Sequence, residues 1–133
     1  MCGIAGFYTN ADTFASRDEL DKMVAALVHR GPDASGVYFS NTVGLGHRRL
    51  SILDLSQDAN QPMESHSMRY VCVYNGEVYN FRSIAKDLNI DFKTTTDTEV
   101  ILEAFAEWGV TFINKLNGMF ALAIFDKQEH KLY

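Results

Sequence analysis

The sequence has little of what marks several large classes of protein. Only two of its 133 residues are cysteine, too few for a disulfide framework. No apolar run approaches the roughly 18–20 residues that cross a bilayer, and no basic segment precedes an apolar one near the start, so we expect no signal peptide and no membrane contact. Blocks of Lys and Arg are missing and the net charge is −5, so we expect no nucleic-acid partner. These absences leave a soluble protein of a reducing compartment, and we expect it in the cytoplasm.

What is present suffices for one domain with a hydrophobic core. Hydrophobic residues make up 47% of the chain and charged residues 22%, as in ordinary globular proteins. Ser16 with Glu19, and Thr96 with Glu99, have the spacing of capping boxes that begin helices. Hydrophobic periodicity predicts helices at 17–29, from about 81, at 97–108 and at 111–116, and strands at 3–8, 36–40, 42–48, 69–75 and 119–126.

Three further segments lead to structural predictions. Residues 49–68 form a long irregular loop, and such loops in compact domains are usually functional. Asn75-Gly76 favours positive φ and predicts that the strand before it ends in a sharp turn. Residues 131–133 read as the start of another strand, which would leave its ladder partners exposed. We therefore expect these residues to be part of a longer protein, incomplete at the C-terminal end.

The first residues suggest a nucleophile. Met1 precedes the small residue Cys2, so aminopeptidase trimming would place a thiol and a free α-amine on one N-terminal residue. An α-amine has a reference pKa of about 7.7–8.0, close to the working pH, which suits a base that moves the proton of a thiol. N-terminal threonines are activated in the same way. If Met1 stays attached, that amine is tied up in a peptide bond and the nucleophile is masked.

The order of several short motifs resembles a known family. The motifs are Cys2-Gly3-Ile4, Arg30-Gly31-Pro32-Asp33, His47 to Ile52, Gln61-Pro62, Asn75 to Asn80 and Thr96 to Glu99. Together they resemble class II glutamine amidotransferase domains, and more narrowly the N-terminal glutaminase domain of glutamine-hydrolysing asparagine synthetases, over residues 2–133.

The resemblance implies an α+β fold of the N-terminal-nucleophile hydrolase type, a four-layer αββα sandwich of two antiparallel sheets. It implies hydrolysis of L-glutamine to glutamate and ammonia through a thioester on Cys2. In the family, ammonia passes to a synthetase domain of the same polypeptide, in which ATP and Mg²⁺ activate aspartate. That domain is absent from residues 1–133, so we expect no cofactor in this glutaminase domain. A homodimer is a further expectation.

The resemblance also assigns roles to individual residues. Asn75 and Gly76 suit an oxyanion hole, because a side-chain amide and a backbone N–H can converge on one developing charge. Arg49 suits the carboxylate of glutamine; Arg48 is an equal candidate by composition, and only the resemblance selects Arg49. The substrate ammonium is assigned to Asp97 and Glu77, although Asp97 also suits the first turn of a helix. Backbone groups around Leu50, Ile52 and Leu53 line the pocket.

Other residues receive supporting or structural roles. Arg30 and Asp33 are expected to brace the pocket, with Arg30 steadying the first strand near Cys2. The four histidines, His29, His47, His66 and His130, lack metal-ligand spacing and are expected on the surface or in the core. Cys72 lies mid-strand and reads as a small buried hydrophobe.

Three alternatives stay open. The acceptor of the ammonia could be something other than aspartate, for instance in polysaccharide biosynthesis. The domain could be a non-catalytic module that binds a partner. It could also be an N-terminal-nucleophile hydrolase that acts on a different amide.

Overall fold

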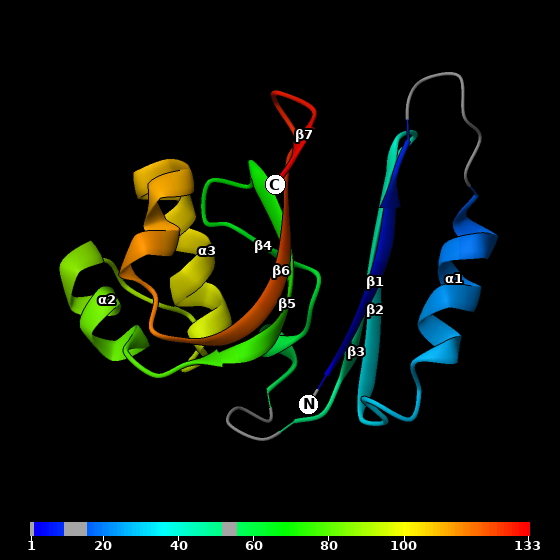
Figure 1. Cartoon of the computed structure of the whole chain (residues 1–133), viewed down its shortest axis with the longest axis horizontal. Coiled ribbons are helices and arrows are strands. Elements are labelled where there is room, and N and C mark those ends of the chain that lie inside the picture. Colours follow the sequence, from blue (N-terminus) through cyan, green and yellow to red (C-terminus); the bar gives the residue numbers. More distant parts are fainter. Residues whose placement is uncertain (1, 10–15, 52–55) are drawn as a thin grey trace.

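A computed structural model describes residues 2–9, 16–51 and 56–133, which form two antiparallel sheets (Figure 1). The first sheet has the order β1-β3-β2 and the second the order β4-β5-β6-β7. Their strands are β1 (Gly3–Tyr8), β2 (Ala34–Phe39), β3 (Val43–Arg49), β4 (Met63–Glu64), β5 (Tyr70–Val78), β6 (Gly118–Asp126) and β7 (Lys131–Leu132). Every strand pair in both sheets is antiparallel.

Helices cover the outer faces of both sheets. Helix α1 (Arg17–Ala26) lies against the first sheet, and α2 (Phe81–Leu88) and α3 (Asp97–Trp108) lie against the second (Figure 1). Short 3₁₀ turns, η1 (Gln57–Ala59) and η2 (Gly109–Lys115), complete the elements. The four layers are therefore helix, sheet, sheet and helices, which confirms the expected αββα sandwich. Among the described helices, none is long and apolar enough to cross a membrane.

Two hydrophobic cores hold the layers together. The core between the sheets contains Val43 and Leu45 of β3, Val71 and Val73 of β5, and Phe125 of β6. The second core lies between the second sheet and the helices, where Cys72 and Tyr74 of β5 pack with α3. Because side chains alternate along a strand, β5 sends odd-numbered residues toward the first sheet and even-numbered ones toward α3.

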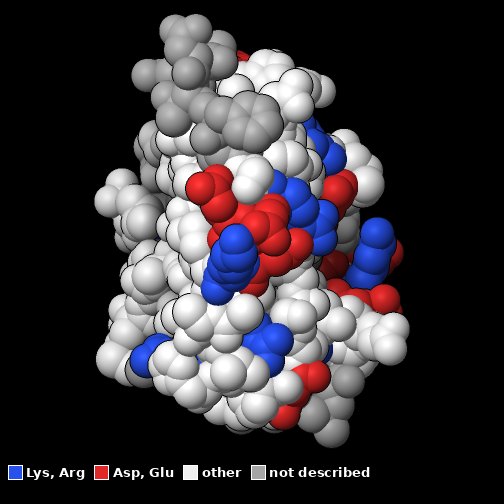
Figure 2. All heavy atoms as spheres, turned by 90° about the vertical axis from the view of Figure 1, so that its right-hand side faces the viewer, with Lys and Arg blue, Asp and Glu red and all other residues white. Residues whose placement is uncertain are grey.

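The outer surface of α1 carries charges of both signs. Figure 2 shows Lys, Arg, Asp and Glu side chains mixed on this side of the molecule. Two i,i+4 pairs, Arg17 with Asp21 and Lys22 with Asp18, account for much of this mixture on the helix. The buried face of α1 carries Leu20 and Val24. The arrangement is that of an amphipathic helix with a solvated outer face.

The structure corrects several sequence-based expectations. Helix α1 ends at Ala26, and residues 27–30 are turns, so it stops before Gly31. Strand β5 continues through Asn75-Gly76 to Val78, because both residues pair with β6, so no turn forms there. Met119 is 65% exposed, although a fully buried strand was expected, since β6 begins at the rim of an open pocket.

The second capping box is only half formed. Thr96 accepts the N–H of Glu99, as expected. The Glu99 carboxylate instead accepts the N–H groups of Lys93 and Thr94 and contacts the ring of His66. Glu99 therefore fastens the loop before α3 rather than closing the helix end. The first capping box, between Ser16 and Glu19, is complete.

Candidate active site

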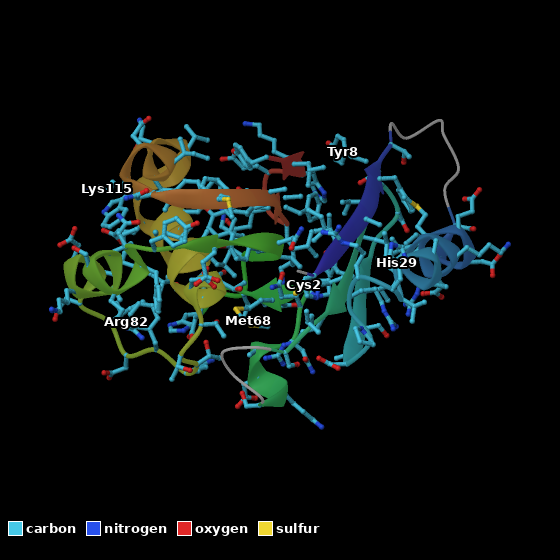
Figure 3. All side chains as sticks on the ribbon, turned by 60° about the horizontal axis from the view of Figure 1, so that its bottom comes forward. Cys2, Tyr8, His29, Met68, Arg82 and Lys115 are labelled. Atoms are coloured by element: carbon cyan, nitrogen blue, oxygen red, sulfur yellow. The ribbon has the colours of Figure 1, made fainter. Side chains whose placement is uncertain are left out.

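A pocket of about 470 Å³ opens at one end of the space between the two sheets. Its lining includes every described residue to which the sequence assigned a catalytic or substrate-binding role: Cys2, Arg49, Leu50, Asn75, Gly76, Glu77 and Asp97. Ile52 and Leu53 lie outside the described residues. Figure 3 shows Cys2 at the start of β1, between the two sheets. Segments up to 119 positions apart in sequence thus meet at one cavity, since Ala121 and Cys2 both line it.

Cys2 is held by backbone contacts on two sides. The Leu50 N–H donates to Cys2 Sγ at 3.4 Å, and Sγ lies 3.8 Å from the Leu50 carbonyl oxygen. Arg30 Nε donates to the Cys2 carbonyl oxygen at 3.3 Å. The sulfur and the backbone of this residue are therefore both fixed, and the half-buried side chain lines the pocket. Met1 lies outside the described residues.

Asn75 and Gly76 reach the pocket from within a strand. In an antiparallel strand, successive N–H groups point to opposite edges. The Tyr74 N–H donates to Gln61 Oε1 at 2.6 Å and the Val78 N–H to Asp97 Oδ2 at 3.0 Å, so both point away from β6. By the same alternation the Gly76 N–H points to that edge, which borders the pocket.

The position of the Asn75 side chain follows from the alternation of side chains between the two faces of a strand. It shares a strand face with Val71 and Val73, which pack toward the first sheet, where Cys2 lies. The side-chain amide of Asn75 and the backbone N–H of Gly76 therefore both border the cavity that the Cys2 thiol lines. Two donors around one cavity can stabilise a developing oxyanion.

Asp97 lies in the first turn of α3 and is buried. Its Oδ2 accepts the Tyr74 hydroxyl at 2.7 Å as well as the Val78 N–H. Burial, and then the hydrogen bond to Asp97, raise the pKa of Tyr74 well above its usual range. The phenol therefore stays a donor, and it fixes a buried carboxylate at the pocket wall. The N-terminal end of the helix is also a favourable place for a negative charge.

The two neighbouring arginines point to opposite faces of β3. Arg49 lines the pocket, and its guanidinium donates to the Ser56 carbonyl oxygen and to Asn60 Oδ1, each at 2.8 Å. Arg48 lines a separate groove beside α1 and donates to the Gly31 carbonyl oxygen at 2.9 Å. Of the two candidates that composition left open, Arg49 is thus the one at the cavity.

Arg30 and Asp33 contact the backbone around the site. Arg30 reaches Cys2, as described above. Asp33 Oδ2 accepts the Ser51 N–H at 2.7 Å, and the Asp33 N–H donates to the Arg49 carbonyl oxygen at 3.0 Å. Neither side chain lines the cavity. These contacts are of the kind that bracing residues make, and the bracing role itself stays a prediction.

Several lining residues were not anticipated as site residues: His47, Ala59, Gln61, Tyr74, Thr96, Thr98, Met119, Phe120 and Ala121. His47 is 1% exposed, and burial lowers its pKa to about 4, with the nearby charge of Arg49 acting in the same direction. The signal for His47 was its place two residues before Arg49 on one strand face. In the described part of the chain, no group of three or more His, Cys, Asp or Glu side chains could hold a metal ion.

Comparisons with known proteins agree with the set of residues that line the cavity. Residues 1–133 match the family described as glutamine amidotransferase domain. The chain is 36% identical, over its whole length, to asparagine synthetase [glutamine-hydrolyzing] 1 of Bacillus subtilis, and 37% identical, over 97% of its length, to asparagine synthetase B [glutamine-hydrolyzing] of Escherichia coli. It is also 36% identical, over 99% of its length, to amidase chry2 of Gibberella zeae. It spans only 22–24% of these relatives. The chain belongs to the glutamine amidotransferase domain family.

Proposed function

We propose that this domain is the glutaminase half of an asparagine-synthetase-type amidotransferase and that Cys2 is its nucleophile. One observation carries the proposal. The sulfur of Cys2, held by the Leu50 N–H at 3.4 Å, lines the same cavity as Asn75, Gly76, Arg49 and Asp97. These residues are the nucleophile, oxyanion donors and charged groups that hydrolysis of an amino-acid amide requires.

In the first half of the proposed reaction, the sulfur attacks the carboxamide carbon of glutamine. The thiol proton goes to the free α-amine of Cys2, which removal of Met1 exposes. The carbonyl oxygen becomes an oxyanion and accepts hydrogen bonds from the Asn75 side-chain amide and the Gly76 N–H. The α-ammonium then returns its proton to the leaving nitrogen, the C–N bond breaks, and ammonia and a thioester are formed.

In the second half, water attacks the thioester carbon with the α-amine as base. The C–S bond breaks, the proton returns to sulfur, and glutamate is released. No oxidant or reductant is needed, because the overall reaction is hydrolysis of one amide bond. The same pair of oxyanion donors serves both tetrahedral intermediates, since both form on the same carbon.

The amino-acid end of the substrate would be held by charge. Arg49 is suited to the α-carboxylate because a guanidinium binds a carboxylate through two N–H groups. Asp97 and Glu77 are suited to the α-ammonium. Asp97 is buried and fixed by Tyr74, whereas Glu77 lies exposed in β5, so the two carboxylates differ in how rigidly they are held. Backbone groups around Leu50, Ile52 and Leu53 complete the proposed pocket.

The use of the ammonia rests on the relatives. Two of them are named as glutamine-hydrolysing asparagine synthetases, which supports aspartate as the acceptor in a synthetase domain of the same polypeptide. ATP and Mg²⁺ would act in that domain, outside residues 1–133. The fungal relative is named as an amidase, which fits the alternative of a hydrolase that acts on a different amide. A cytoplasmic location and a homodimer complete the proposal.

The test is glutamine hydrolysis by the intact protein and its Cys2→Ala and Cys2→Ser variants. We expect both variants to lose glutamate formation and to keep the circular dichroism and melting behaviour of the parent. A Cys72→Ser variant is the control for general loss of a thiol. Equal hydrolysis by Cys2→Ala and the parent would exclude the mechanism. Adding aspartate, ATP and Mg²⁺ and measuring asparagine would then test the acceptor.

Assays on the same protein also distinguish the proposed function from two alternatives. A non-catalytic module would bind a partner without hydrolysing glutamine. A hydrolase of another amide would release ammonia from asparagine or from small amides in preference to glutamine. Product analysis over a panel of amides therefore distinguishes all three possibilities.

A further inference from the structure

One edge of strand β5 borders the pocket, and two of its backbone N–H groups donate to side chains. The Tyr74 N–H donates to Gln61 Oε1 at 2.6 Å, and the Val78 N–H donates to Asp97 Oδ2 at 3.0 Å. The Gly76 N–H lies between them on the same edge, because successive N–H groups of a strand alternate between its two edges. The proposed oxyanion donor is therefore flanked on both sides by backbone groups that side chains hold in place.

Gln61 extends the pairing of this edge toward the proposed oxyanion donors. The paired part of β4 reaches Cys72 of β5, opposite Met63. If the same register continued, Gln61 would stand opposite Tyr74. Its backbone carbonyl oxygen instead lies so close to Gly36 of β2 that a Cβ there would collide with it. The side-chain oxygen of Gln61 therefore takes the N–H that a backbone carbonyl group accepts in a regular ladder.

The partners of the Gln61 amide fix its orientation. A backbone N–H can only donate, so the atom that faces Tyr74 is the amide oxygen. Gln61 Nε2 then donates to Thr98 Oγ1 at 3.3 Å. Thr98 follows Asp97 in the first turn of α3. Both hydrogen bonds are buried, so the Gln61 side chain joins β5 to α3 in the wall of the cavity that it lines.

Resting on the proposed function, we propose that Gln61 is a positioning residue that acts through Tyr74 to aim the Gly76 N–H at the developing oxyanion. A donor stabilises an oxyanion most when it already points to the place where the charge develops, because no reorganisation is then needed during the reaction. Loss of the bond to Tyr74 releases one of the two N–H groups that flank Gly76. The peptide plane of Gly76 can then tilt about the strand axis, and the donor is no longer aimed.

The contacts predict an effect on the reaction rate rather than on substrate binding. Arg49, proposed for the substrate carboxylate, is held by other residues. Asp97, proposed for the substrate ammonium, keeps its donors from Tyr74 and Val78 when the Gln61 amide is removed. Both the oxygen and the nitrogen of that amide have partners in the protein. Replacement of Gln61 should therefore lower kcat and leave the KM for glutamine nearly unchanged.

The first test compares Gln61→Met with the parent in the intact protein. Methionine matches glutamine in length and lacks the amide. We expect kcat for glutamine hydrolysis to fall about 10-fold, the upper end for one neutral hydrogen bond, and the KM to stay within about two-fold. Gln57→Met, which is exposed in η1 and lies outside the pocket, is the matched control and should keep both constants. A parental kcat in a folded Gln61→Met protein, or a change confined to the KM, overturns the inference.

Variants of Thr98 test the same contacts with less disturbance of the strand. Thr98→Val removes the acceptor of Gln61 Nε2 but keeps the shape of the side chain and the bond to Tyr74. We expect kcat to fall about 3-fold, the lower end for one neutral hydrogen bond. Thr98→Ser keeps the hydroxyl group and should retain most of the parental kcat. Equal kcat values in the valine and serine variants would contradict the inference.

Alkylation of Cys2 by iodoacetamide distinguishes positioning of the donor from a general disturbance of the pocket. The thiol displaces iodide at a saturated carbon, so no oxyanion forms and the rate does not depend on the Gly76 N–H. We expect Gln61→Met and the parent to be alkylated at equal rates, measured by mass spectrometry of the peptide that contains Cys2. A rate that falls in parallel with kcat would place the defect at the nucleophile and contradict the inference.

Failure of the proposed function and failure of the role of Gln61 give different results. If the parent protein hydrolyses no glutamine, the proposed function fails. If the parent hydrolyses glutamine and Gln61→Met has the parental kcat, only the role of Gln61 fails.

Discussion

The Tyr74 hydroxyl donates to Asp97 Oδ2 at 2.7 Å and so ties strand β5 directly to the first turn of helix α3. Both side chains are buried and both line the pocket. Strand β5 also carries Asn75 and Gly76, so one hydrogen bond links the element with the proposed oxyanion donors to a proposed ligand of the substrate ammonium. The geometry of the site therefore depends on contacts that lie behind it.

Removing this hydroxyl should affect both stability and substrate binding. We expect Tyr74→Phe to destabilise the fold by about 1.5–3 kcal/mol, the range for hydrogen bonds to charged groups, because a buried carboxylate loses a donor. The KM for glutamine should rise about 10-fold, with a smaller change in kcat. Urea unfolding and steady-state kinetics measure the two effects. Tyr70→Phe, in the same strand but outside the pocket, should change neither; an unaltered KM in Tyr74→Phe would show that Asp97 needs no such support.

Gly76 should tolerate no side chain. A Cβ at this position would lie 2.4 Å from the Met119 carbonyl oxygen and 2.5 Å from Phe120 Cβ, so the paired strand β6 would have to move. We expect Gly76→Ala to lower kcat/KM by at least 100-fold, the usual effect of losing one oxyanion donor.

Gly109→Ala is the control for Gly76→Ala. Its φ is +60°, and a Cβ there meets no atom within 4 Å, so Gly109→Ala should cost stability through backbone strain and leave activity intact. Melting curves and hydrolysis rates of both variants check the contrast. Comparable activity in the two would mean that the Gly76 N–H is not part of the oxyanion hole.

The ion pair between Arg69 and Asp126 should make stability depend on acid pH. The Arg69 guanidinium lowers the pKa of the buried Asp126 carboxyl from 3.8 to about 2. Because the pKa is lower in the folded state, the stabilisation is complete above about pH 4 and is lost as the pH falls toward 2. We expect Asp126→Asn to cost about 1–2 kcal/mol at pH 7 and to flatten the decline between pH 4 and 2. Thermal unfolding across this range measures it, with Asp87→Asn on the exposed side of α2 as control; parallel curves for Asp126→Asn and the parent would refute it.

Arg30 should act on the nucleophile without touching the substrate. Its Nε donates to the Cys2 carbonyl oxygen at 3.3 Å, and its side chain does not line the cavity. We expect Arg30→Met to lower kcat about 10-fold, the value of roughly one hydrogen bond, while the KM for glutamine stays within two-fold. Initial-rate kinetics measure the two constants separately, and Lys86→Met on α2 is the control. A change confined to KM would place Arg30 in substrate binding instead.

Much of the fold follows from the sequence because its signals are local. Ser16 and Glu19 mark the start of α1, and the apolar run after Asn117 marks β6, as observed. The prediction of a turn at Asn75-Gly76 was wrong for a physical reason. The pair prefers a turn in isolation, but the ladder with β6 fixes it in an extended conformation, and the glycine is required by close approach rather than by positive φ.

The site was predictable in its parts but not in its connections. Cys2, Arg49 and Asp97 stood out by chemistry and by family resemblance. His47 did not, because its place two residues before Arg49 shows only that the two residues share a strand face and not what lies opposite them. Glu99 shows the same limit: its spacing from Thr96 predicts a capping box, yet His66, far away in sequence, competes for the carboxylate. Contacts between distant segments are set by packing, which single-sequence periodicity does not encode.

The central claim is that Cys2 is an unmasked nucleophile, and covalent labelling tests it most directly. The intact protein is treated with a glutamine analogue that carries an electrophilic diazoketone in place of the amide, and the labelled peptide is identified by mass spectrometry. Cys72 is an internal control, because it is fully buried and burial raises its pKa to about 12. We predict one label per chain, on a Cys2 that has lost Met1, with protection by glutamine. No label on Cys2, or a label there that glutamine fails to suppress, would contradict the account.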